Sequence, residues 1–157
     1  MTAHKQLIED FYNAFNRLDG KTMGECYHDE VVFYDPVFEN LDARHAKAMW
    51  KMLTSTAKDF SLTFSDVEAS EEYGSCKWIA TYTFSKTGRK VVNHVKAHFK
   101  FHEGKIVEHM DDFNLYKWSR QALGTPGLLL GWSSSMHKKI RKNAKDGLAL
   151  YMKRHRL

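Results

Sequence analysis

The chain has 157 residues, 43% of them hydrophobic and 13% aromatic, which is typical of a folded globular protein and excludes a disordered one. No apolar run approaches the roughly 18 residues that a membrane-spanning helix needs. The first residues also lack the apolar core of a signal peptide. Two cysteines, Cys26 and Cys76, make neither a disulfide framework nor a zinc site. We therefore expect a cytoplasmic protein with free thiols and no membrane span.

The net charge of +5 is concentrated at the C-terminal end. Residues 138–157 carry eight Lys or Arg residues against one acidic residue, a net +7, so the rest of the chain carries a net −2. We expect a helix with a solvated basic face, packed on its own domain or on a dimer partner. Binding of nucleic acid or of an anionic surface is the alternative. No aromatic and basic stacking platform accompanies the charges, so nucleic acid is not the expected partner.

Hydrophobic periodicity and capping residues predict the elements up to residue 90. They are a first helix capped by Thr2 and stopped at Asp19 and Gly20, a short second helix opened by a capping box over 22–25 and ending near His28, a strand over 31–35 broken by Pro36, a loop over 36–42, a third helix capped by Asp42 and running to Ala57, and strands over 60–64 and 78–84.

The stretch 91–118 contains two alternating runs around a turn at Glu103 and Gly104, which is a strong β-hairpin signal. In the second run the apolar face also carries His109 and Asp111. Charge on a buried face is costly unless it is paired or used. The hairpin is therefore where we expect the functional chemistry.

The loop length of this hairpin decides which residues face inward. A three-residue loop with Gly104 in the left-handed conformation buries Phe113 and Leu115 and exposes Glu108 and Asp112, and we favour it for that reason. A two-residue loop would turn the opposite face inward. The favoured register sets Phe99 opposite Val107, Ala97 opposite His109, and Val95 opposite Asp111.

After Trp118 the chain becomes apolar and is punctuated by Gly and Pro over 122–132, and a helical pattern capped within 133–135 follows. The apolar stretch would either close a pocket as a lid or lie in a dimer interface, and both remain open. The expected organisation is a single domain over residues 1–157, with a core over 1–118, an apolar loop over 119–135 and a basic C-terminal helix over 136–157.

Four stretches of the chain resemble the SnoaL-like branch of the nuclear transport factor 2-like superfamily. They are FYNAFNRLDG, HDEVVFYDPVF, the TGR turn and FKFHEGKIVEHMDDF, within residues 5–118. The resemblance implies an α+β fold, a cystatin-like cone in which a curved mixed β-sheet carries helices on its concave face. The expected order is ααβαββββ plus a C-terminal helical extension, with a pocket inside the cone and frequently a homodimer. This fold hosts isomerases, cyclases, hydrolases and binding modules, so the resemblance specifies fold more than function.

Ketosteroid isomerases of this superfamily place an Asp base before a Pro at the end of the first strand. Asp35 before Pro36 is similar to that arrangement. Their two oxyanion donors, a Tyr on the first helix and a protonated Asp on the penultimate strand, fall at Phe11 and Ala97 here. The resemblance therefore supplies the base and not its partners.

Limonene epoxide hydrolases use an Asp on the last strand, and Asp111 is similar to it. Their Arg-x-Asp pair falls at Trp78 and Ala80, and their water-positioning Asn falls near Asp35. SnoaL-type polyketide cyclases use an Asp and a His without a metal. His109 and Asp111 are compatible with that pattern.

Asp111, His109 and Asp35 are the candidate acid–base residues. An acid in an apolar pocket has a raised pKa, which suits proton transfer. His109 lies on the same face as Asp111, one strand repeat of roughly 6.5–7 Å away. The structural alternative for each is a hydrogen-bonded core residue or an Asp-Pro turn. The candidate ligand-binding residues are Asn93, Tyr82, Trp50, Trp78, Phe33, Phe99 and Phe113.

We expect neither a metal nor a cofactor. His94, His98 and His102 share one strand face but lie too far apart to chelate an ion. No Gly-rich phosphate loop, Ser-His-Asp arrangement or reactive-Cys motif is present. The sequence thus predicts a cofactor-free enzyme that isomerises, cyclises or hydrates a small apolar oxygenated molecule, as an isomerase, a cyclase or an epoxide hydrolase would. The alternative is a non-catalytic ligand-binding or homodimeric module.

Overall fold

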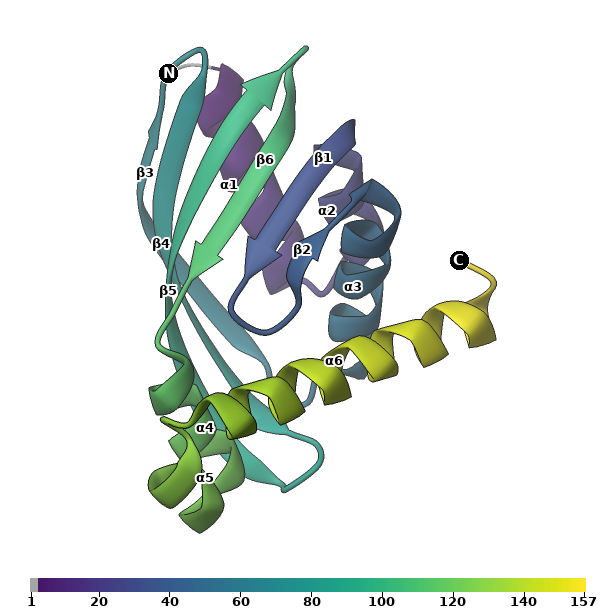
Figure 1. Ribbon diagram of the computed structural model, residues 1–157. Coiled ribbons are helices and arrows are strands. Elements are labelled where there is room, and N and C mark those ends of the chain that lie inside the picture. The colour runs from purple at the N-terminus through teal and green to yellow at the C-terminus, as the bar shows by residue number, and fades with distance from the viewer. Residues whose placement is uncertain (1–2) are drawn as a thin grey trace.

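The computed structural model describes residues 3–157 and contains a curved six-stranded sheet with helices on its inner side and at one end (Figure 1). The strand order is β2-β1-β6-β5-β4-β3, and β1 runs parallel to β6 whereas the other neighbours are antiparallel. The fold is the mixed α+β cone that the sequence predicted. In chain order the elements are α1 (Ala3–Asn16), α2 (Gly20–Glu25), β1 (Tyr27–Asp35), β2 (Glu39–Leu41), α3 (Ala43–Thr56), β3 (Ser61–Ala69), β4 (Tyr73–Phe84), β5 (Arg89–His102), β6 (Lys105–Asp112), α4 (Leu115–Leu123), α5 (Thr125–Leu130) and α6 (Ser134–His155).

The first strand differs from its prediction in length and in its partners. β1 begins at Tyr27 and not at Val31, and the predicted loop over 36–42 contains β2, which folds back on the end of β1 with Tyr34 opposite Asn40. Three residues are too short for a periodic signal, so the sequence pattern missed β2. The longer β1 matters for function because it brings Tyr27 into the interior.

Local hydrogen bonds explain where the helices begin. Asp42 caps α3 as predicted, since its carboxylate accepts from the backbone N–H of His45 at 3.0 Å. The cap of α2 is Asp19 and not Thr22, whose backbone N–H donates to the Asp19 carboxylate at 3.1 Å. The predicted cap Thr2 lies outside the described residues.

The core lies between the inner face of the sheet and the helices α1 and α3 (Figure 1). The strands alternate as expected for a half-buried sheet. Along β5, Val95, Ala97 and Phe99 are buried, while His94, Lys96 and His98 are exposed on the outer face.

The central hairpin corrects the predicted register. The turn is a two-residue loop, with His102 opposite Lys105 and with positive φ at both Glu103 (50°) and Gly104 (76°), as in a type I′ turn. A bulge follows, because Phe101 pairs with Ile106 and Lys100 pairs with Glu108. The resulting register sets Phe99 opposite His109 and Ala97 opposite Asp111, two residues from the predicted pairing.

The bulge explains why the faces of His109 and Asp111 were predicted correctly from a wrong register, although that register placed Ile106 outward and Ile106 is buried. A two-residue loop alone would bury Ile106 and expose His109. The extra residue, Val107, resets the alternation, so that Ile106, His109 and Asp111 are all buried while Glu108 is exposed.

The segment 119–135, predicted as a loop, is mostly helical. β6 ends at Asp112, so Leu115 is not part of the strand and instead begins α4, which is capped by Asn114. α4 is followed by the short α5 and by α6, which is capped by Ser133, within the predicted 133–135. The three helices lie across the lower end of the sheet, opposite the β5–β6 turn (Figure 1).

Candidate functional site

The buried polar groups of the last strand form a chain of hydrogen bonds across the interior. Trp50 Nε1 donates to the hydroxyl of Tyr27 at 2.8 Å, and that hydroxyl lies 2.7 Å from His109 Nδ1. His109 Nε2 lies 2.9 Å from Asp111 Oδ1, and Trp78 Nε1 donates to the same oxygen over 3.4 Å. The side chains of His109 and Asp111 are 0% and 3% exposed.

One arrangement of protons gives every group in this hydrogen-bonded series a partner. The Trp50 indole can only donate, so the Tyr27 hydroxyl accepts from it and turns its own proton toward His109 Nδ1. His109 Nε2 then carries the ring proton and donates to Asp111. Burial raises the pKa of Tyr27 well above its usual value, which keeps the hydroxyl protonated.

Aromatic rings surround the imidazole of His109. The ring centroids of Phe99, Phe33 and Phe11 lie 4.6, 5.1 and 5.4 Å from that of His109. The Trp50 indole is stacked on it at 6.2 Å. These walls keep water away from the hydrogen-bonded chain, and electrostatic interactions are stronger in such surroundings.

Tyr12 adds a further polar group to the interior. It is fully buried on α1, and burial together with the charge of Asp111 raises its pKa well above the usual value. Its hydroxyl is the buried side-chain atom that lacks a well-formed hydrogen bond among residues 3–157, although the Cys76 thiol lies beside it. An unpaired buried hydroxyl costs free energy, so it is a candidate donor for a ligand oxygen.

Asp35 lies at the end of β1, where the interior approaches the C-terminal helices. Its Oδ1 accepts from the backbone N–H groups of Val37 at 2.8 Å and Phe38 at 2.6 Å. Burial raises the pKa of Asp35 from 3.8 to about 6, the two hydrogen bonds oppose that rise, and the charge of Asp111 adds to it. Both hydrogen bonds described for Asp35 reach Oδ1, which leaves Oδ2 as the atom available to a ligand.

The helical extension covers the end of the cone at which Asp35 lies. Trp118 Nε1 donates to the Tyr82 hydroxyl at 2.8 Å, and Arg141 Nε donates to the carbonyl of Pro36 at 2.9 Å. A small second core, formed by Val91, Leu115, Trp118, Ala122 and Ile140, fills the space between α4, α6 and the sheet.

The predicted site residues therefore fall into two groups. His109, Asp111, Trp50, Trp78, Phe33 and Phe99 are buried together in the interior. Asp35, Tyr82, Asn93 and Phe113 are only partly buried. Tyr27 joins the two predicted acid–base residues of β6 and was missed, because its strand was predicted to begin after it.

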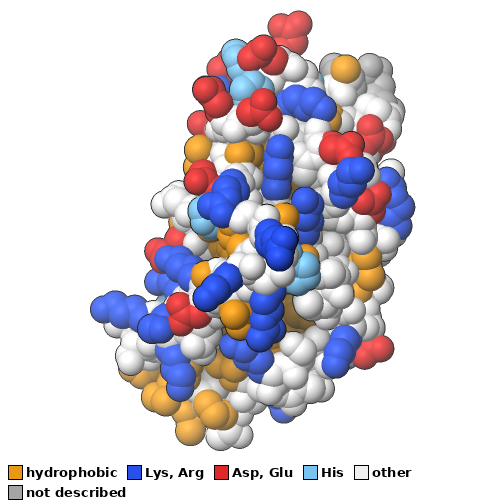
Figure 2. Space-filling model, turned by 90° about the vertical axis from the view of Figure 1, so that its right-hand side faces the viewer, with side chains coloured by type: hydrophobic (Ala, Val, Ile, Leu, Met, Phe, Trp, Pro, Cys, Tyr) orange, Lys and Arg blue, Asp and Glu red, His pale blue; other side chains and the backbone are white. Residues whose placement is uncertain are grey.

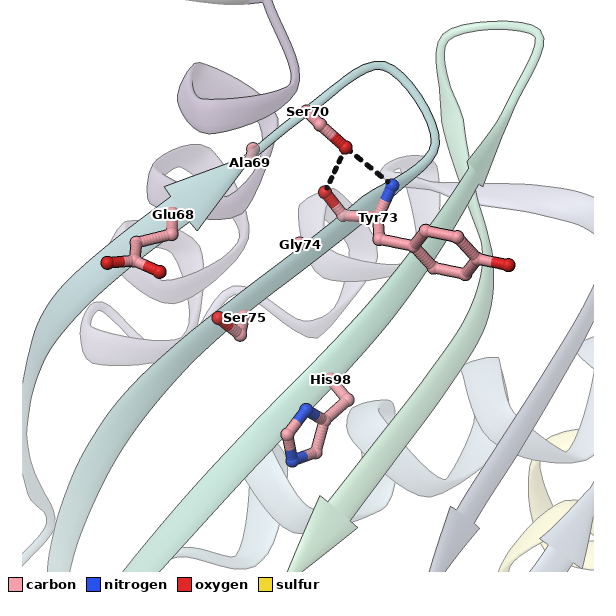
Figure 3. Close-up of a pocket in the computed structure, with 7 residues that line it drawn as sticks. All are labelled: Glu68, Ala69, Ser70, Tyr73, Gly74, Ser75 and His98. Carbon is pink, nitrogen blue, oxygen red and sulfur yellow. Dashed lines mark hydrogen bonds between the residues drawn. The ribbon is translucent and has the colours of Figure 1, made fainter.

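Two surface features lie apart from this interior. A shallow hollow of about 450 Å³ at the β3–β4 turn is lined by Glu68, Ala69, Ser70, Tyr73, Gly74, Ser75 and His98 (Figure 3). Its hydrogen bonds join Ser70 to the backbone of Tyr73 and so hold the turn. His98 points to the outer face of β5, away from His109.

The second feature is a group of possible metal ligands at the tip of the central hairpin. The ligand atoms of His28, His102 and Glu103 all lie within 4.8 Å of one another. The His28 Nδ1 accepts from the backbone N–H of Glu30 at 3.0 Å, so its Nε2 carries a proton and donates to Glu103. A metal ion at Nε2 would break both bonds, and the donor set therefore fits a hydrogen-bonded turn better than an ion site.

Comparison with known proteins places these elements in a family. Residues 8–109 match the SnoaL-like domain. No curated protein matches the sequence at a significant level. The match covers the elements from α1 to His109 on β6, and α4 to α6 lie beyond it.

Solved structures share the fold. TsrD from Streptomyces laurentii has 24% sequence identity and a TM-score of 0.66, over 78% of this chain and 95% of that one. An LEH-like epoxide hydrolase from M. tuberculosis has 18% identity and a TM-score of 0.65, over 81% and 92%. IdmH from Streptomyces antibioticus, a proposed polyketide cyclase, has 21% identity and a TM-score of 0.63, over 76% and 97%.

Proposed function

The chain belongs to the SnoaL-like family, and we propose that it is a cofactor-free acid–base enzyme acting on a small, largely apolar, oxygenated molecule. Membership of this family supports a small-molecule enzyme or binder. The buried and partly buried polar residues support the particular reaction. The observation that carries it is the raised pKa of Asp35, about 6, at the end of a cone whose interior holds Tyr27, His109 and Asp111. A carboxyl group with a pKa near the working pH both accepts and returns a proton efficiently.

The three predicted acid–base residues take different roles in this proposal. Asp35 is the group that meets the substrate, because Asp111 is sealed and already hydrogen-bonded. Asp35 Oδ2 removes a proton from the carbon beside a carbonyl, forming an enolate, and returns the proton to the same or a conjugated carbon. His109 and Asp111 are buried positioning residues that do not touch the substrate.

Deuterium exchange tests this chemistry without knowledge of the natural substrate. The protein is incubated in D₂O with 2-tetralone, an apolar enolisable ketone, and label at the α-carbon is followed by mass spectrometry. We expect exchange above the buffer rate, lowered about 100-fold or more by Asp35→Asn. Asp29→Asn is the matched control, since Asp29 is an exposed carboxylate on the same strand. Equal exchange in the wild type and Asp35→Asn would reject the assignment.

A second isotope-labelling experiment distinguishes epoxide hydrolysis from proton transfer on carbon. An apolar epoxide in ¹⁸O-labelled water gives a labelled diol if the chain adds water to it. A labelled diol without exchange of the ketone would show that the site activates water for addition to an epoxide and does not transfer a proton to or from carbon.

The second candidate function is a non-catalytic ligand-binding module. The observation that favours it is the closure of the interior, where the His109 and Asp111 side chains are 0% and 3% exposed and hydrogen-bond to each other. This alternative predicts that 2-tetralone binds, shown by calorimetry, and is recovered without label. A homodimer and a cytoplasmic location are further predictions of the sequence. Light scattering measures the first and fractionation of cells measures the second.

A further inference from the structure

The two most exposed large hydrophobic side chains of residues 3–157, those of Trp132 and Leu129, lie together at one end of the molecule. Leu128, Leu129 and Leu130 on α5 are 49%, 62% and 51% exposed, and Trp132, which follows α5, is 71% exposed. We call residues 128–132 the apolar tip. Large apolar side chains so close together on a monomer surface mark an interaction site.

The backbone holds the apolar tip in place. Gly127 is the buried residue of α5, and a Cβ there would lie 2.0 Å from the carbonyl oxygen of Ser119, so α5 is seated closely on α4. The Trp132 indole donates to the carbonyl of Leu129 at 2.8 Å, and the Tyr116 hydroxyl donates to the carbonyl of Leu128 at 3.1 Å. Because these contacts fix the position of α5 and of Trp132, the side chains of the apolar tip are exposed in the folded structure itself.

Positive charge lies directly beside the apolar tip. α6 begins at Ser134, two residues after Trp132, and carries the exposed Lys138, Lys139 and Lys142 on its first turns. Figure 2 shows hydrophobic side chains gathered at the lower end of the molecule, where Figure 1 places α5, with Lys and Arg side chains next to them. An apolar surface rimmed by cations matches the boundary between lipid headgroups and acyl chains.

Charge complementarity selects among the possible partners. A second copy of the chain docked through the same surface would bring two basic helices together, which is repulsive. Nucleic acid would satisfy the lysines but would leave three leucines in water. An anionic bilayer accommodates both, because acyl chains bury the leucines, the interface favours Trp, and the phosphates attract Lys.

We propose that the chain docks on anionic membrane surfaces by inserting the apolar tip and laying the basic start of α6 on the headgroups. No helix of residues 3–157 is long and apolar enough to cross a bilayer. The docking is therefore peripheral. It does not require that the interior be catalytic, and it uses helices beyond the SnoaL-like match.

Vesicle sedimentation of the full chain tests the docking. Phosphatidylcholine vesicles with and without phosphatidylserine are compared at low and high salt. We expect binding only to the anionic vesicles, weakened by salt because screening shortens the reach of the charges. Trp132 reports insertion by a blue shift and loss of acrylamide quenching, since Trp50, Trp78 and Trp118 are only 2%, 7% and 8% exposed.

Two variants separate the apolar and the charged contributions. Leu129→Gln with Trp132→Gln, and separately Lys138→Glu with Lys139→Glu, should each weaken binding about tenfold or more. The matched controls change the outer face of the sheet, where Met110 is 49% exposed and Lys77 lies opposite Lys96. Met110→Gln, and Lys77→Glu with Lys96→Glu, should bind like the wild type.

Three outcomes would overturn the docking proposal. Binding that the apolar-tip variant leaves unchanged would show that the lysines act alone. No vesicle binding, combined with salt-sensitive binding of single- or double-stranded RNA, would assign the basic helix to nucleic acid. No vesicle binding, combined with a solution mass that falls to that of the monomer in the apolar-tip variant, would make the tip a contact between copies of the chain.

Discussion

The interior of the cone and the apolar tip both reverse the usual placement of polar and apolar side chains, in opposite ways. The interior buries His109 and Asp111 almost completely, and hydrogen bonds to Tyr27 and Trp78 compensate for the lost water. The tip exposes Leu129 and Trp132, and no other part of residues 3–157 covers them. Buried polar side chains that the chain itself hydrogen-bonds indicate chemistry in the interior. Exposed apolar side chains that the chain leaves uncovered indicate a binding partner.

The largest expected effect comes from breaking the interior network. Tyr27→Phe removes the hydroxyl that joins Trp50 to His109 and leaves one donor and one acceptor without partners. Each buried unsatisfied group costs about 1–3 kcal/mol, so the two together should cost about 2–6 kcal/mol in urea unfolding. Tyr73→Phe is the control, because Tyr73 is 56% exposed and should change stability by about 0.5 kcal/mol at most. Equal small losses would show that the network contributes no net stability.

Asp35 should make stability depend on pH in a way that Asn does not. Because its folded pKa is raised from 3.8 to about 6, the folded state resists ionisation more than the unfolded state. The contribution of this group is fully present below about pH 4 and is lost as pH rises through about 6, up to about 3 kcal/mol.

Asp35→Asn keeps an oxygen acceptor for Val37 and Phe38 and removes this loss. We expect a gain of about 1–3 kcal/mol near pH 7.5 and almost none near pH 4, measured by urea unfolding at each pH. Asp29→Asn, on the exposed part of β1, should show no such pH dependence. A constant difference across the pH range would contradict the raised pKa.

The close seating of α5 can be broken by one methyl group. In Gly127→Ala the new Cβ would lie 2.0 Å from the Ser119 carbonyl oxygen, so α5 must move away from α4. We expect a loss of about 1–3 kcal/mol and faster proteolysis between residues 124 and 132. An unchanged cleavage rate would show that the tip is held by other contacts.

The smallest effect is expected on the solvated part of α6. Gly147 lies in the interior of this helix with nothing within 4 Å of a new Cβ. Gly147→Ala should therefore raise the free energy of unfolding by about 0.5–1 kcal/mol through helix propensity alone. Thermal unfolding of both variants checks this prediction. Gly147→Ala should raise the unfolding temperature and Gly127→Ala should lower it, if the helices are packed as described.

Membership of the SnoaL-like family makes the helical extension the distinctive part of this chain. The three solved neighbours are covered over 92–97% of their own lengths, whereas they cover 76–81% of this chain. The helices that close the cone and carry the apolar tip lie beyond the family match at residues 8–109. The inner chemistry and the outer surface are thus encoded in separate parts of the sequence.

Features that depend on neighbours in sequence were predictable. Asp42 and Ser133 cap their helices through hydrogen bonds to N–H groups three residues on, so the signal is local. The alternation of apolar and polar residues along β5 likewise predicts that Val95 and Phe99 are buried, as they are. These local patterns predicted most of the element order, whereas the fold class followed from the resemblance to the SnoaL-like branch.

Features that depend on distant segments were decided only by the tertiary structure. The bulge beyond Lys100 set the hairpin register, although the faces of His109 and Asp111 were predicted. Tyr27 meets His109 across 82 positions because β1 pairs in parallel with β6, and no local pattern contains that pairing. The sequence by itself placed two polar residues on an inner face, and the tertiary structure alone gave them partners and closed the cone, because pairing across long separations depends on which strands meet.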